Sequence, residues 1–107
     1  MITSIEALKA ACSLKEVVVQ IKGTDQEIKL RELSVKDRSD HIAMMKEHEN
    51  DYHYQAAWVV ARSCPDLKDG DVDALMELGA NHVQLLAAEV FRVSGLLSEK
   101  TEEVLKN

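Results

Sequence analysis

The chain of 107 residues has the length of one domain, and with 46% hydrophobic and 30% charged residues its composition is that of an ordinary globular protein. The net charge is −6, and Glu32 and Asp37 interrupt the densest basic stretch, Lys29 to Arg38, which argues against a nucleic-acid-binding face. No apolar run approaches the roughly 20 residues that a membrane span needs, so we expect a cytoplasmic protein that binds neither nucleic acid nor membrane.

The first predicted element is a short helix over residues 3–13. Thr3 and Glu6 have the spacing of a capping box. Apolar residues then recur at intervals of three and four as far as Cys12, which gives the helix one apolar stripe.

The period of the apolar residues changes to two between residues 15 and 33. Alternate positions from Val17 to Ile21 are β-branched, and apolar residues alternate again at Ile28 and Leu30. The segment Gly23-Thr24-Asp25 between them is typical of a turn. The pattern therefore predicts a β-hairpin of two short strands.

Residues 34–97 are predicted to form the helical body, a bundle of about four helices. The first of these begins after Ser34, a good N-cap residue, and has Ile42 and Met45 as its apolar stripe. The next is the most apolar piece of the chain, because every residue from Ala56 to Ala61 is apolar. Such a segment is expected to be buried on most of its sides.

Two further helices are predicted after the Asp69-Gly70 turn. A short one covers residues 72–78, and a long one starts at Asn81, which with Gln84 repeats the capping-box spacing. The long helix has the clearest amphipathic stripe of the chain, formed by Val83, Leu86, Val90, Val93 and Leu97 and broadened by Leu85, Ala87 and Phe91. Residues 98–107 form a polar tail. We therefore expect a single, mainly α domain of the α+β class.

No pattern of catalytic or metal-binding residues emerges from the sequence. The acidic loop around Gly70 lacks three ligands that a calcium loop requires. The histidines have no zinc-ligand spacing and are expected at the surface or at helix ends: His41, His48, His53 and His82. Cys12 and Cys64 are expected to be buried thiols in a reducing compartment. With neither a nucleophile elbow nor a glycine-rich phosphate loop, we expect no enzyme, no cofactor and no metal.

The aromatic cluster Tyr52, Tyr54 and Trp58 is the candidate for partner binding. Tyrosine and tryptophan are enriched at interface hot spots, and Tyr54 and Trp58 are four residues apart, on one helix face. The flanking Ala57 and Val59 favour a core position for Trp58, with the two tyrosines nearer the surface.

The pieces between residues 15 and 97 follow one another in a specific order. They are the step Arg31-Glu32-Leu33 after the hairpin, the capped helix start at residues 34–38, the alanine-rich helix at 56–64, the Asp69-Gly70 turn, the short helix with Val72 and Leu75, and the long helix at 81–95. This order resembles that of the tail assembly chaperones of long-tailed bacteriophages. The leading helix, residues 3–13, has no counterpart in the resemblance.

The resemblance implies a mainly helical, non-virion protein of the infected host's cytoplasm that is absent from the mature virion. Such a chaperone binds the tape measure protein, keeps that long helical chain soluble and promotes assembly of the tail tube around it. The tail tube protein is then a second candidate partner, and a frameshifted longer form is expected in many such phages. The alternatives are a small helical phage regulator or adaptor acting on a host protein and, third, a structural virion protein. The open hairpin edge also allows a homo-oligomer.

Overall fold

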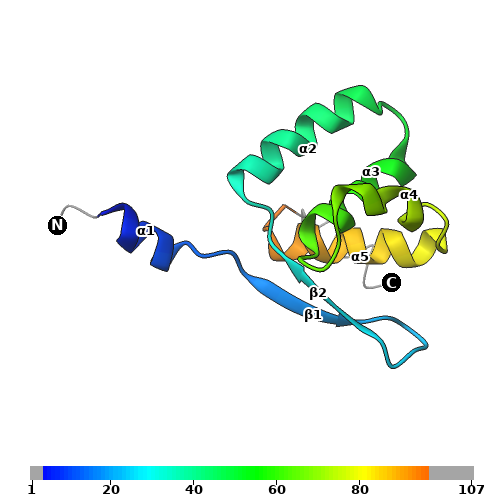
Figure 1. Cartoon of the computed structure of the whole chain (residues 1–107), viewed down its shortest axis with the longest axis horizontal. Helices are drawn as coiled ribbons and strands as arrows, with labels where there is room; N and C mark the ends of the chain where they lie inside the picture. Colours follow the sequence, from blue (N-terminus) through cyan, green and yellow to red (C-terminus); the bar gives the residue numbers. More distant parts are fainter. Residues whose placement is uncertain (1–3, 97–107) are drawn as a thin grey trace.

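The computed structural model describes residues 4–96 (Figure 1). This part of the chain contains the helices α1 (Ile5–Ala11), α2 (Val35–Glu47), α3 (Tyr52–Ser63), α4 (Val72–Leu75) and α5 (Ala80–Val93), and the strands β1 (Glu16–Gln20) and β2 (Glu27–Arg31). The mainly helical α+β character is confirmed, whereas the arrangement of the helices as a bundle stays a prediction. Leu97 and the tail 98–107 lie outside the described residues.

Helix α1 stands apart from the rest of the molecule (Figure 1). Its N-cap is Ser4, whose hydroxyl accepts a hydrogen bond of 3.1 Å from the backbone N–H of Ala7. The N-cap is therefore one residue later than the predicted cap, Thr3, which lies outside the described residues. None of its residues is buried. Cys12, which follows α1, is exposed, so the prediction that it is buried was wrong. No other segment of residues 4–96 packs over this end of the helix.

The hairpin has the predicted alternation of sides. Its antiparallel register pairs Val17 with Leu30 and Val19 with Ile28, and these four side chains face the helices, with Leu30 completely buried. Gly23 occupies the turn with a φ of +84°, a conformation that glycine adopts without a steric penalty. The hairpin thus gains its stability by laying one face on the helical body.

The core lies between α3 and α5, which run side by side (Figure 1). Every residue from Ala56 to Ala61 is buried, as the unbroken apolar run predicted. The stripe of α5 is confirmed at Val83, Leu86 and Val90. Leu85, expected to broaden that stripe, is 39% exposed instead, and it lies on the surface of α5.

Two predicted helix boundaries in the C-terminal half were wrong, the end of the short helix and the start of the long one. A 3-10 turn at Asp69–Asp71 precedes α4, which ends at Leu75 and is shorter than the expected helix 72–78. Helix α5 begins at Ala80 with Gly79 as its N-cap and without a side-chain cap. Asn81 therefore lies inside the helix, where a capping box with Gln84 cannot form.

Helix α2 begins with the predicted cap but presents an unexpected side to the core. Ser34 and Asp37 form a capping box, in which each side chain accepts a 3.0 Å hydrogen bond from the other's backbone N–H. The buried residues of α2 are Asp37, His41 and Met44, whereas Ile42 of the predicted stripe is exposed. Polar residues occupy the inner side because side chains of β2 and α3 bind them.

Candidate partner-binding groove

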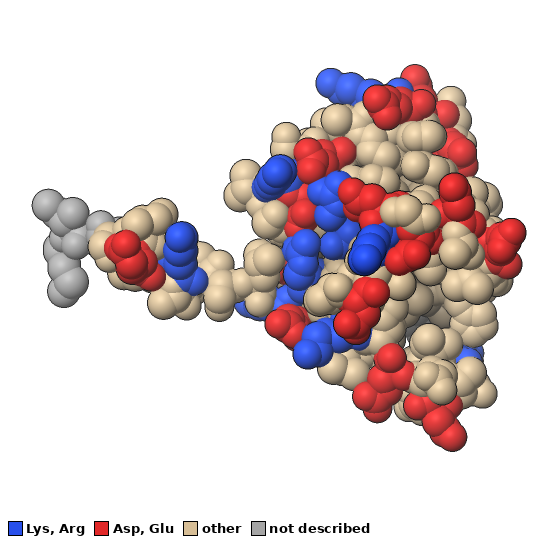
Figure 2. All heavy atoms as spheres, in the orientation of Figure 1, with Lys and Arg blue, Asp and Glu red and all other residues tan. Residues whose placement is uncertain are grey.

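A network of ion pairs fixes the N-terminal half of α2 to β2 and α3. An Nη1–Oδ2 distance of 2.6 Å joins Arg31 to Asp37. The guanidinium of Arg62 lies 3.4 Å from Asp37, 2.7 Å from Asp40 and 3.3 Å from Asp69. Figure 2 shows basic and acidic side chains interleaved where the hairpin meets the helices. Two arginines thus hold three segments that are distant in sequence.

Burial and hydrogen bonding act in opposite directions on the charges of this network. Burial alone would raise the pKa of Asp37, but hydrogen bonds from Arg31 and Ser34 outweigh it, so the pKa is lowered. Burial alone would lower the pKa of Arg62, but its bonds to Asp40 and Asp69 raise it. Both groups are therefore charged at neutral pH, and the network is satisfied internally.

Ser63 attaches the outer edge of β2 to α3. Its hydroxyl accepts a 3.1 Å hydrogen bond from the backbone N–H of Arg31 and donates one to the carbonyl oxygen of the same residue. The Arg31 guanidinium also donates to the carbonyl oxygen of Arg62 at 3.1 Å. Backbone groups that an edge strand normally leaves open are thereby paired with a buried helix.

His41 holds the middle of α2 against the core. Its ring stacks on Trp58 with centroids 5.7 Å apart and lies 5.6 Å from the ring of Phe91. The Arg38 guanidinium donates to its Nδ1 over 2.6 Å. Burial, together with the charge of Arg38, lowers the pKa of His41. The prediction of a surface or helix-end position was wrong for this histidine, which is buried.

Beyond His41, a groove of about 460 Å³ lies between α2, α3 and α5. Its lining combines aliphatic and aromatic carbon with a few side-chain amides. The lining residues are His41 and Met45 of α2, Tyr52, Gln55 and Ala56 of α3, and Asn81, Gln84, Leu85, Ala87, Ala88 and Phe91 of α5. The groove is open to solvent at Tyr52, which is 66% exposed, and at Leu85.

The three aromatic candidates occupy different positions relative to the groove. Tyr52 lines it. Tyr54 is half-buried and stacks on His48, with ring centroids 3.8 Å apart. Trp58 is only 9% exposed and lies 4.6 Å beneath the Arg62 guanidinium, which confirms its core position. A role of these residues in partner binding stays a prediction, and Tyr52 is the one best placed for it.

The sequence pattern did not predict that residues of α5 line an open groove. The pattern predicts a helix cap at Gln84 and core positions for Leu85 and Ala87; the core position is confirmed for Ala87 and wrong for Leu85. The adjacent small residues Ala87 and Ala88 were the available signal, because small side chains leave room for a neighbour.

The acidic loop next to α4 has local structural roles. The Asp71 carboxylate accepts a 2.8 Å hydrogen bond from the backbone N–H of Lys68, and Asp69 pairs with Arg62. Between residues 4 and 96, no three His, Cys, Asp or Glu side chains are grouped to hold a metal ion. The helices of this range include none with the length and apolarity needed to cross a membrane.

Comparison with known proteins adds no family assignment. No protein-family model, no curated protein and no solved structure matches this chain.

Proposed function

We propose that this chain is a non-catalytic binding protein that accepts an amphipathic helix of a client protein in the groove between α2, α3 and α5. The observation that carries the proposal is the groove itself, an open channel of about 460 Å³ with a largely apolar lining. Recognition of an apolar helix face by a groove between helices is a recurring mode of protein binding.

The lining suits a helix in both size and chemistry. Ala56, Ala87 and Ala88 carry the smallest apolar side chains and let a client backbone approach closely. Gln84 adds an amide group that can hydrogen-bond the polar flank of an amphipathic helix, and Gln55 adds its carbonyl oxygen, since its Nε2 donates to the carbonyl oxygen of His48 at 2.8 Å. Tyr52 projects beside them as a large, exposed aromatic anchor.

The anchoring of α2 supports a preformed groove. One half of α2 is fixed by the Asp37 ion pairs and the middle by His41, and Met45 then forms the groove wall. Because these contacts already fix α2 in place, little conformational entropy is lost when a client binds, and this favours affinity.

The client that we propose is the tape measure protein of a long-tailed bacteriophage. This part of the proposal rests on the resemblance in the order of elements to tail assembly chaperones, whose client is long and helical. The net charge of −6 would help to keep a complex with an apolar client in solution. On this proposal the protein acts in the host cytoplasm, is absent from the virion and promotes tail tube assembly.

Coexpression with a tape measure protein, chosen from the gene neighbourhood of this chain, tests the proposal. We expect the tape measure protein to become soluble and to copurify. Met45→Lys, which puts a charge into the groove wall, is expected to weaken copurification about tenfold, since an unpaired charge must then be desolvated against the client.

Ile42→Lys is the matched control, because Ile42 is an exposed apolar residue of the same helix outside the groove lining. It should leave copurification unchanged. An insoluble tape measure protein without copurification would contradict the client, and equal effects of the two substitutions would contradict the groove.

A further inference from the structure

Helix α1 has an apolar side that nothing covers in the described part of the chain. Ile5 and Leu8 are three residues apart on this helix, and both are exposed. Leu14 in the following linker is exposed as well. An isolated helix of seven residues is unstable in water, since most helical stability comes from packing an apolar side. The helix therefore requires a surface to pack on.

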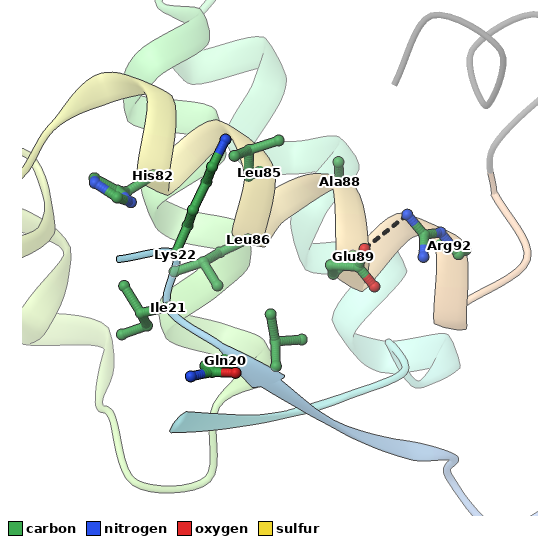
Figure 3. Close-up of a pocket in the computed structure, with 10 residues that line it drawn as sticks. Gln20, Ile21, Lys22, His82, Leu85, Leu86, Ala88, Glu89 and Arg92 are labelled. Carbon is green, nitrogen blue, oxygen red and sulfur yellow. Dashed lines mark ion pairs between the residues drawn. The ribbon is translucent and has the colours of Figure 1, made fainter. Parts of the chain in front are cut away.

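A second hollow, separate from the client groove in most of its lining, lies between the end of β1 and α5. Its volume is about 240 Å³. Figure 3 shows Ile21 and Leu86 at its base, and the side chain of Lys22 reaching from the strand end toward Leu85. Glu89 and Arg92 form an ion pair of 2.7 Å along its α5 side. The hollow thus offers apolar surface bordered by charges of both signs.

The charges of α1 complement those of this hollow. Glu6 and Lys9 lie on the same side of the apolar stripe of α1, Glu6 in its first turn and Lys9 in its last. Lys22 carries a positive charge at one side of the hollow, and Glu89 carries a negative one at the other. If Leu8 enters the hollow, Glu6 can lie toward Lys22 and Lys9 toward Glu89, so that each charge meets its opposite.

The path of the chain favours the α1 of a second copy, rather than the copy's own α1, as the helix that fills the hollow. The hollow borders Val19 to Lys22, whereas α1 joins the opposite end of β1 through residues 12–15. Four extended residues span at most about 14 Å, so α1 reaches the hollow of its own copy only by reversing along the strand. When two β1 strands lie antiparallel, the start of each strand lies beside the end of the other.

The free edge of β1 permits that arrangement. Ile21 and Lys15 pair their backbones with Gln26 and Glu32 of the other side of the hairpin. By the alternation of an antiparallel ladder, the backbone groups of Glu16, Val18 and Gln20 point to the outer edge. No third strand pairs there in the described part of the chain, so a second copy of β1 can add to the sheet.

From these observations we infer that the chain forms a symmetric dimer in which α1 of each copy covers the hollow between β1 and α5 of the other. The hollow shares Leu85 and Ala88 with the client groove, and the other residues of the groove lie outside it. The inference does not rest on the proposed function, and either can fail alone.

Sedimentation velocity of the full chain tests the dimer. We expect the wild type to be dimeric, and Leu8→Glu to weaken association at least about tenfold because a charge enters the hollow. Val35→Glu is the matched control, because Val35 is 90% exposed at the start of α2 and does not line the hollow. Since α1 buries nothing within its own copy, the melting temperature of the monomer should be the same in both variants. A monomeric wild type, or a Leu8→Glu dimer as tight as the control, would overturn the inference.

A charge exchange tests the orientation of α1. Glu6→Lys and Lys22→Glu are each expected to weaken the dimer several-fold, and the double variant to recover most of the loss. Losses that simply add in the double variant would contradict the Glu6–Lys22 contact.

A mixed sample distinguishes exchange between copies from folding back within one copy. One copy carries a nitroxide on Cys12, which is exposed, and the other is ¹⁵N-labelled with Cys12→Ser. We expect line broadening at the amides of His82 and Glu89 in the ¹⁵N copy. Broadening that appears only when label and nitroxide share one chain would overturn the exchange.

Discussion

An Nη1 atom of Arg31 lies 2.6 Å from a carboxylate oxygen of Asp37, so a largely buried ion pair joins the last residue of β2 to the first turn of α2. The Asp37 side chain is 8% exposed, and it also completes the capping box with Ser34. One carboxylate therefore fixes both the start of α2 and its position on the hairpin, which in turn positions one wall of the client groove.

Replacing this carboxylate should destabilise the fold. Asp37→Asn leaves Arg31 without its nearest counter-charge, and we expect the free energy of unfolding to fall by about 3 kcal/mol. Urea denaturation measures the change. Asp25→Asn, an exposed aspartate in the hairpin turn, is the control and should stay within about 0.5 kcal/mol of the wild type. A loss as small as that of the control would contradict the structural role of Asp37.

Removing the Ser63 hydroxyl should loosen the attachment of the hairpin. Ser63→Ala leaves the N–H and the carbonyl of Arg31 without their partner, and we expect a loss of about 2 kcal/mol. Amide hydrogen exchange of Arg31 should become faster, whereas Ser13→Ala in the exposed linker should change neither quantity. Unchanged exchange at Arg31 would show that Ser63 does not hold this edge.

Stability should decrease as the pH falls below the ordinary histidine range because of His41. Its pKa in the folded state is lower than the ordinary value of 6.5, so the unfolded chain takes up the proton first as the pH falls. The contribution of neutral His41 is complete above pH 6.5 and is lost as the pH falls toward its lower folded pKa. Urea denaturation at about pH 7.5 and about pH 5.5 measures the loss.

His41→Gln cannot titrate and should show a smaller pH dependence over this interval. Asp37, the other buried titratable residue of α2, affects stability only at lower pH, because its pKa in the folded state lies below 3.8. The stability that it contributes is complete above pH 3.8 and is lost as the pH falls through the folded pKa. An identical slope for wild type and His41→Gln near pH 6 would refute the assignment to His41.

The two tyrosines should respond differently to truncation. Tyr52 is exposed in the groove lining, so Tyr52→Ala should weaken client binding about tenfold without a change in melting temperature. Tyr54 packs on His48, so Tyr54→Ala should lower the stability by about 1 kcal/mol. Calorimetry of the two variants, with and without client, separates these effects. A large stability loss for Tyr52→Ala would place Tyr52 in the fold rather than in the binding surface.

The elements with regular periodicity were predictable from the sequence. The alternation at Val17, Val19, Ile28 and Leu30 defined the hairpin, because a half-buried strand requires a period of two. The spacing of Val83, Leu86 and Val90 likewise defined the inner side of α5. In each case the apolar residues whose spacing predicts the element are also the residues that pack into the core.

The inner side of α2 was not predictable in this way. Asp37 and His41 are polar, and their burial depends on Arg31, Arg62, Trp58 and Phe91, which come from three other elements. A sequence pattern does not show such partners, so the more apolar Ile42 and Met45 were expected there.

The groove and the exposure of α1 were missed for a related reason. Leu85 and Cys12 have the chemistry of core residues, and the surface around them is open only because of how α2, α5 and the hairpin are arranged. The position of Tyr52 beside α5 depends on the same tertiary packing, which local sequence does not encode.

On the proposed function, the groove between α2, α3 and α5 binds a helix of a tape measure protein. Titration of the ¹⁵N-labelled chain with synthetic helical segments that tile such a protein tests it most directly. We expect saturable amide shift changes that are largest at Gln55, Gln84 and Ala88, and a Kd that Met45→Lys raises about tenfold. The absence of saturable changes with every segment, or changes confined to the hairpin and α1, would contradict it.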